Sequence, residues 1–110
     1  MQARQGDVFI ERISELPDGL VPVARERGRV VLAHGEVTGH AHAIANRDAR
    51  LLARPGETLG EAVERWLHIG DDGATLTHEE HATITLAPGV YRVVHQREWT
   101  DDMEPILVAD

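Results

Sequence analysis

The chain contains no cysteine, which excludes a disulfide framework and any metal site built on thiolate ligands. It also has no apolar run approaching the ~20 residues that a membrane-spanning helix needs. Its first residues do not lead into an apolar signal segment, because Asp7, Glu11 and Arg12 interrupt them. These absences predict a cytoplasmic protein with no membrane partner.

Basic and aromatic residues are also scarce. Lys and Arg number 11 against 19 Asp and Glu, so the net charge is −8 with His neutral. An acidic chain repels polyphosphate, which makes nucleic acid an unfavourable partner. The aromatic residues Phe9, Trp66, Tyr91 and Trp99 are not interleaved with a basic face, and we expect them to pack in the core.

Turn-forming residues divide the chain into short segments rich in Val, Ile, Leu and Thr, as at Pro88-Gly89. Short apolar segments punctuated by Gly and Pro are typical of β-sandwiches and barrels. We therefore predict an all-β fold, a small single-domain β-barrel or sandwich over residues 1–110. The expected strands lie at residues 7–14, 21–25, 29–34, 40–46, 49–54, 65–69, 74–78, 82–87, 90–97 and 105–109.

Two local signals refine this prediction. Asp72-Gly73 stands between two strand-like segments and is typical of a two-residue hairpin turn. Thr58 and Glu61 have the spacing of a helix capping box, so one short helix is the alternative for that stretch. Such a helix would leave the fold class unchanged.

The 7 histidines include two close pairs, of which the first is His40 and His42. They follow Gly39 in a strand-like segment, where residues two apart project from one face about 6.5–7 Å apart. Two imidazoles in that arrangement can bind one metal ion with bonds of about 2.0–2.1 Å.

The second pair is His78 and His81, separated by Glu79-Glu80. If the chain reverses at the two glutamates, the histidines become cross-strand neighbours with Cβ atoms about 4.5–5.5 Å apart. A bulge or a single helical turn would also bring both rings to one side.

The two pairs together predict one site for a divalent transition metal, such as Zn, Fe, Mn or Ni, since imidazole suits all of these. The predicted ligands are His40, His42, His78 and His81. Glu36 or Glu80 would transfer protons beside the metal as catalytic groups. The remaining histidines are expected to be incidental, with His95 the strongest exception among His34, His68 and His95.

A His-x-His sequence that enters a strand of a small, glycine-punctuated β protein resembles the cupins. This resemblance implies a β-barrel that binds one divalent metal through histidines and a glutamate. Gly35 stands one position closer to His40 than in the cupin motif, and Asn46 stands where that motif has glutamate. The cupin resemblance therefore implies a fold and a metal but not individual ligands.

The chain also resembles, over nearly its whole length, a family of small uncharacterised bacterial and phage proteins. This resemblance rests on five blocks, QGDV from Gln5, GEVTGHAH from Gly35, HEEH from His78, PGVY from Pro88 and QREW from Gln96. It implies no particular activity. It does place His40, His42, His78 and His81 within the shared blocks.

Three classes of function remain open at this point. The first is a cupin-type metal-dependent enzyme that acts on a small molecule. The second is a non-catalytic metal-binding or sensing module, in which a homodimer could supply histidines from both chains. The third is a metal-free hydrolase or ribonuclease that uses a histidine pair, with Arg97 stabilising an oxyanion.

Overall fold

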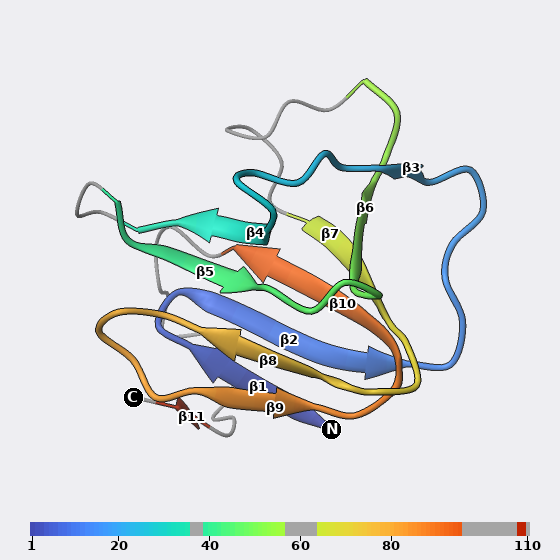
Figure 1. Ribbon diagram of the computed structural model, residues 1–110. Coiled ribbons are helices and arrows are strands. Elements are labelled where there is room, and N and C mark those ends of the chain that lie inside the picture. Colours follow the sequence, from blue (N-terminus) through green and yellow to red (C-terminus); the bar gives the residue numbers. More distant parts are fainter. Residues whose placement is uncertain (36–38, 57–63, 96–107, 110) are drawn as a thin grey trace, which may run out of the picture.

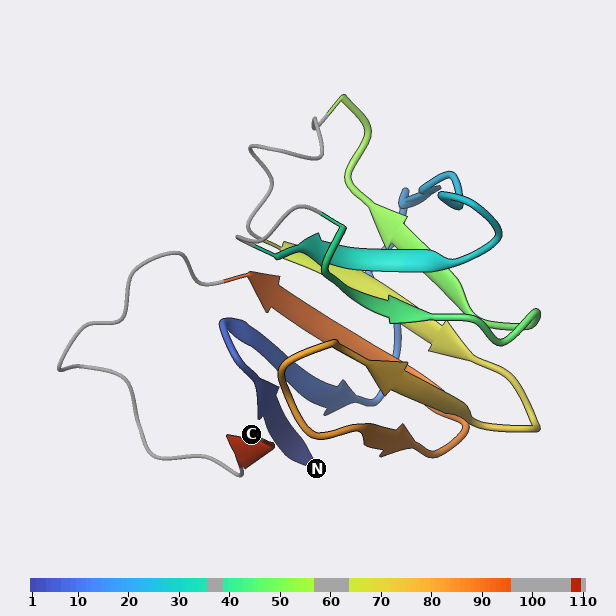
Figure 2. The same cartoon turned by 60° about the vertical axis from the view of Figure 1, so that its left-hand side comes forward.

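The computed structural model describes residues 1–35, 39–56, 64–95 and 108–109, whose strands form two facing sheets (Figure 1 and Figure 2). The strand order is β11-β1-β2-β10-β7-β6-β3 in the larger sheet and β4-β5-β8-β9 in the smaller one. The all-β prediction is therefore confirmed. Of the two architectures expected, the molecule has the sandwich, because the described strands leave both sheets open at their edges.

The larger sheet contains β1 (Gln2–Gln5), β2 (Val8–Ile13), β3 (Val21–Pro22), β6 (Arg50–Ala53), β7 (Glu64–Ile69), β10 (Gly89–His95) and β11 (Val108–Ala109). The smaller sheet contains β4 (Val30–His34), β5 (Ala41–Ile44), β8 (Ala74–Thr77) and β9 (Ile84–Leu86). Paired strands run antiparallel except β1 and β11, which run parallel. All the expected strands are present, most of them shorter where the structure describes both of their ends, and β1 is an addition that the sequence did not predict.

The structure also bears on the predicted turn at Asp72-Gly73, whereas the possible helix lies outside the described residues. A turn does join β7 to β8 at Asp72-Gly73, with Gly73 at a φ of 70°, but the predicted two-residue hairpin is wrong, because β7 and β8 belong to different sheets and do not pair. The possible helix at Thr58 and Glu61 lies outside the described residues, as do Glu36 and Arg97. Within the described part of the chain, no helix has the length and apolar character that crossing a bilayer requires.

The core lies between the two sheets and consists of alternate residues from their strands. Val8 and Ile10 of β2 and Val93 of β10 face Ile44 and Leu76 of the smaller sheet, and all five are at most 1% exposed. This is the period-two pattern expected of strands that have one buried face. Two aromatic residues behave as predicted, because Tyr91 and Trp66 are buried.

One arginine organises the turn before β4. The Arg25 guanidinium donates hydrogen bonds to the carbonyl oxygens of Gly28, Asn46, Arg47 and Ala49, at distances from 2.6 to 3.0 Å. These bonds tie the turn at residues 26–29 to the loop between β5 and β6. The Arg25 side chain thus connects two loops that no strand pairing joins.

We expect Arg25→Met to lower the free energy of unfolding by about 2 kcal/mol, because hydrogen bonds to a charged donor contribute about 1.5–3 kcal/mol and water would satisfy some of the freed carbonyls. Urea denaturation measures this change. Arg50→Met is the matched control, since Arg50 is exposed on β6, and its effect should stay within about 0.5 kcal/mol. Equal effects of the two substitutions would show that Arg25 does not hold the loops together.

Candidate metal centre

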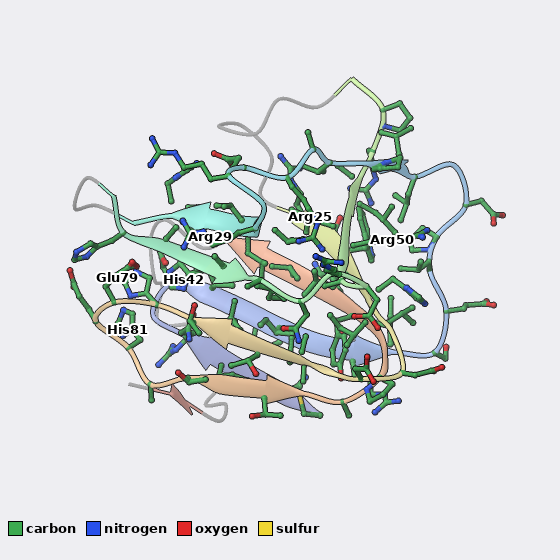
Figure 3. The ribbon with its side chains drawn as sticks, viewed as in Figure 1. Arg25, Arg29, His42, Arg50, Glu79 and His81 are labelled. Carbon is green, nitrogen blue, oxygen red and sulfur yellow. The ribbon has the colours of Figure 1, made fainter. Side chains whose placement is uncertain are left out.

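Four segments that are distant in the sequence meet at one end of the sandwich. They are the β1–β2 turn, the start of β5, the β8–β9 loop and the end of β10 (Figure 1). His42, Glu79 and His81 lie together there in Figure 3. The four histidines that the sequence singled out all lie at this end, on the β5 segment and the β8–β9 loop.

The rings of these histidines form one cluster around His78. The centroid of the His78 ring lies 4.2 Å from that of His42, 4.7 Å from that of His81 and 6.1 Å from that of His40. The His42 and His78 rings are stacked, with 29° between their planes. The proximity of the two pairs is therefore as predicted.

The β8–β9 connection differs from the tight hairpin that was one expectation. Leu76 pairs with Ile84, so His78 and His81 both lie in the loop between the strands rather than opposite each other in a ladder. Glu79 holds this loop in place, since its carboxylate accepts a 2.9 Å hydrogen bond from the backbone N–H of Ala41. That bond lowers the pKa of Glu79.

His42 is the buried member of the cluster, with 2% of its surface exposed. Burial disfavours the charged imidazolium, and the neighbouring His78 acts in the same direction, so the pKa of His42 falls from 6.5 to about 4. His42 is therefore neutral at neutral pH. A neutral imidazole has one bare ring nitrogen, which is the form that binds a metal ion.

Gln5 determines which nitrogen of His42 is bare. The Gln5 Nε2 donates to the carbonyl oxygens of Leu76 and Ala82, at 3.2 and 2.9 Å, so its Oε1 faces His42 as an acceptor. This oxygen lies 2.8 Å from the Nδ1 of His42, which must carry the proton. The Nε2 of His42 is consequently unprotonated and carries a lone pair.

That lone pair faces a carboxylate. The Nε2 of His42 lies 3.3 Å from Oδ1 of Asp7, and the other oxygen of Asp7 accepts a 2.9 Å hydrogen bond from the Nε2 of His95. With His42 neutral, two acceptors face each other with no hydrogen between them. A cation fits such a pair, since 3.3 Å is about the N···O separation of two ligands with bonds of about 2.1 Å to one tetrahedral ion.

His40 has a comparable arrangement at the solvent side of the cluster. Its Nδ1 lies 2.8 Å from Oε1 of Glu80, so Glu80 orients the ring as carboxylates orient metal-bound histidines. Glu80, predicted as a proton-transfer group, thus contacts a histidine directly. The role predicted for Glu36 lies outside the described residues.

The side chains are not yet arranged around one point. Among the described residues, no three His, Asp or Glu side chains form a ready-made metal site. The ring of His78 is one obstacle, since its Nδ1 accepts a 3.0 Å hydrogen bond from the backbone N–H of Glu80 and its Nε2 then carries the proton. Metal binding through the Nε2 of His78 requires this bond to break and the ring to turn.

Gly6 gives His81 its place beside the β1–β2 turn. A Cβ atom on Gly6 would lie 2.6 Å from the Nε2 of His81, and Gly6 itself has a φ of 57°. A positive φ at the first residue of a two-residue hairpin is the usual place for glycine. The turn therefore brings Asp7 to the cluster and leaves room for His81 at the same time.

Three members of the centre escaped prediction, namely Gln5, Asp7 and His95. Gln5 and Asp7 belong to the QGDV block, which supported the family resemblance but carried no role. His95 was expected to be incidental, although it was the strongest exception among the single histidines. The two other single histidines lie apart from the centre, because His34 pairs with Glu26 and His68 is an exposed residue of β7.

The low pKa of His42 predicts acid sensitivity of the metal-free protein. The unfolded chain binds this proton with a pKa near 6.5 and the folded chain only near 4, so stability falls as the pH drops from about 6.5 to about 4. We expect a loss of about 3 kcal/mol over that window. Urea unfolding at several pH values measures it. In His42→Leu the unfolding free energy should lose this pH dependence, whereas the exposed His68→Leu should keep it.

The fold and the site define an all-β sandwich with a histidine cluster at one end. Residues 4–96 match the family model described as a domain of unknown function (DUF8820), and the chain belongs to this family. This agrees with the predicted membership of a small uncharacterised family. Neither the curated proteins nor the solved structures contain a match.

Proposed function

We propose that this protein binds one divalent transition-metal ion at the end of the sandwich where the histidines gather. The observation that carries the proposal is the bare Nε2 of His42 opposite the carboxylate of Asp7. His42 is buried and the Asp7 carboxylate is 37% exposed, and two facing acceptors of this kind repel each other without a proton or a cation between them. An ion between these atoms would remove that cost.

The proposed ligands are His42 and Asp7, joined by histidines from the neighbouring segments. His81 and His78 lie on a loop that can adjust its rings, and His40 lies at the rim with its ring oriented by Glu80. Gln5 and His95 are positioning residues, since each donates to or accepts from a ligand rather than facing the ion. Such partners typically change metal affinity by about 10- to 100-fold when they are removed.

The number and type of the protein ligands determine whether the bound ion keeps a coordination position open for a small molecule. Imidazole and carboxylate ligands suit Zn, Fe, Mn and Ni alike. Four protein ligands close a tetrahedral zinc site, whereas a six-coordinate Fe or Mn ion keeps positions for a small molecule. A cupin-type reaction therefore goes with Fe or Mn, and a sensing or structural module goes with Zn. The cytoplasmic location and the homodimer stay predictions.

The test is the metal content of protein purified without a histidine tag, measured by elemental mass spectrometry before and after chelation. We expect about one ion per chain, lost on chelation and restored by titration with Co²⁺, whose visible spectrum reports nitrogen and oxygen ligands. Asp7→Asn should weaken Co²⁺ binding, and His68→Ala should not. Protein that neither carries nor takes up metal would contradict the proposal.

A further inference from the structure

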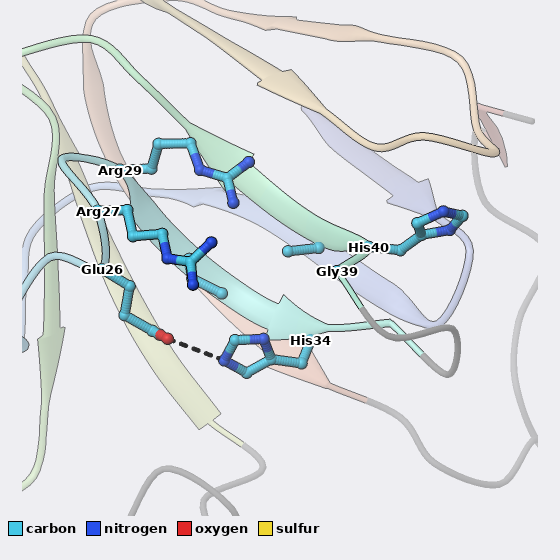
Figure 4. Close-up of a pocket in the computed structure, with 8 residues that line it drawn as sticks. Glu26, Arg27, Arg29, His34, Gly39 and His40 are labelled. Carbon is cyan, nitrogen blue, oxygen red and sulfur yellow. Dashed lines mark ion pairs between the residues drawn. The ribbon is translucent and has the colours of Figure 1, made fainter.

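A second candidate site lies on the outer side of the smaller sheet, away from the core. It is a groove of about 480 Å³, within the size range of small-molecule sites. Its lining comes from the turn before β4, from β4 and from the start of β5 (Figure 4). The lining residues are Glu26, Arg27, Arg29, Val31, His34, Gly39, His40 and Ala41.

The floor of the groove is apolar. Val31 and Ala41 are each 3% exposed, and with Ala43 they form a small cluster separate from the main core. Alternation along β4 and β5 explains the separation, since neighbouring residues such as His42 and Ile44 face the other way.

Two guanidinium groups stand at one end of this floor. Arg27 and Arg29 lie side by side there in Figure 4, with His40 at the opposite end. Within the described part of the chain, neither guanidinium has an acidic partner, although the chain has 19 acidic residues. The one carboxylate in the lining, that of Glu26, is paired with His34 at 3.0 Å.

The backbone that presents Arg27 is unusual. Arg27 and Gly28 have φ values of 54° and 79°, and Glu26 and Arg29 pair on either side of them, as in a type I′ hairpin turn. Both central positions of this turn favour Asn, Asp or Gly. Arg27 is the only non-glycine residue with positive φ in the described chain. The conformation of the turn therefore does not account for arginine at position 27, and a role of its guanidinium group in binding would account for it.

We propose that the groove binds a small organic acid, with its carboxylate between Arg27 and Arg29 and its short apolar body on Val31 and Ala41. Guanidinium groups match a carboxylate with paired hydrogen bonds. The net charge of −8 repels multiply charged anions most strongly, so a monocarboxylate fits this protein better than phosphate. This proposal does not depend on metal binding.

The test uses pentanoate, its neutral counterpart 1-pentanol, and inorganic phosphate as probes of the metal-free full chain. Backbone amide shifts in ¹H–¹⁵N spectra report where each probe binds. We expect pentanoate to shift the amides of Val31, Gly39 and Ala41, and to bind at least about tenfold more tightly than either other probe. Equal binding of pentanol, or binding of phosphate alone, would overturn the proposal.

Charge substitutions make the test more specific, because removing a positive charge and removing a negative charge should change the affinity for pentanoate in opposite directions. Arg29→Gln should weaken pentanoate binding about tenfold, and Glu26→Gln should strengthen it severalfold by removing the carboxylate that lines the groove. Arg50→Gln, on the other sheet, should change nothing (Figure 3). An equal loss in Arg29→Gln and Arg50→Gln would overturn the assignment to this groove.

Arg27→Asn separates binding from folding. Asn suits the left-handed conformation better than Arg, so the urea midpoint should stay the same or rise while pentanoate binding weakens. Retained pentanoate affinity in this variant would overturn the role given to Arg27. His40 lines the groove and also lies at the rim of the metal centre, but Arg27 and Arg29 belong to the groove alone. Metal titration of the arginine variants should therefore be unchanged, and failure of one proposal does not affect the other.

Discussion

His42→Leu should weaken Zn²⁺ or Co²⁺ binding by about 100-fold or more, which is the largest effect we expect of any single substitution. Loss of a positioning residue alone costs about 10- to 100-fold, and His42 is proposed as a direct ligand. Leu fills a similar volume, so the sandwich should persist by circular dichroism. Competition with a chromophoric chelator measures the affinity.

The control for this experiment is His34→Leu, which removes an exposed imidazole that pairs with Glu26 on the outer side of the smaller sheet. Its metal affinity should equal that of the unchanged protein. If His42→Leu still bound one ion per chain with similar affinity, the facing acceptors at His42 and Asp7 would not be the centre of the site. The ion would then belong to His78 and His81, the half-buried histidines of the β8–β9 loop.

Gln5→Met should lower the free energy of unfolding by about 3 kcal/mol. Gln5 is fully buried, and its amide satisfies the Leu76 carbonyl and the Nδ1–H of His42, so both buried groups lose their partners. Each buried polar group left without a partner costs about 1–3 kcal/mol, while water can reach the exposed Ala82. Urea denaturation measures the loss.

Gln2→Met on the same strand is the matched control. The amide of Gln2 bonds to Glu11 at the surface, so its loss should change stability by less than about 0.5 kcal/mol. Gln5→Met should also weaken Co²⁺ binding about tenfold, because the His42 ring loses the acceptor that fixes its protonated nitrogen. Equal stability of the two variants would contradict the role of the buried amide.

Hydrophobic alternation was enough to predict the fold class, because most strands bury one face and leave the other polar. β1 was missed for a physical reason: its residues are Gln2, Ala3, Arg4 and Gln5, and a buried glutamine breaks the apolar pattern. The burial of Gln5 depends on partners contributed by β8 and the loop after it. No local pattern contains that information.

The site was predictable to the extent that its residues stand in pairs. Spacing alone singled out His40 and His42, at the start of β5, and His78 and His81, in the β8–β9 loop. The resemblance to a small-protein family then placed all four within shared blocks. Asp7 and His95 come from separate segments, and the hydrogen bond between them joins residues 88 positions apart. Such a contact follows from the strand order, with β2 beside β10, and not from sequence spacing.

The long sequence separations within the centre have a consequence for how the chain folds. The amide of Gln5 reaches Leu76 and Ala82 across 71 and 77 positions, so these contacts form only after both sheets have come together. An ion held between Asp7 and His42 therefore contributes little to the early stages of folding, since these two residues meet only when the sheets have assembled. By binding only the finished structure it should slow unfolding and leave the rate of folding nearly unchanged.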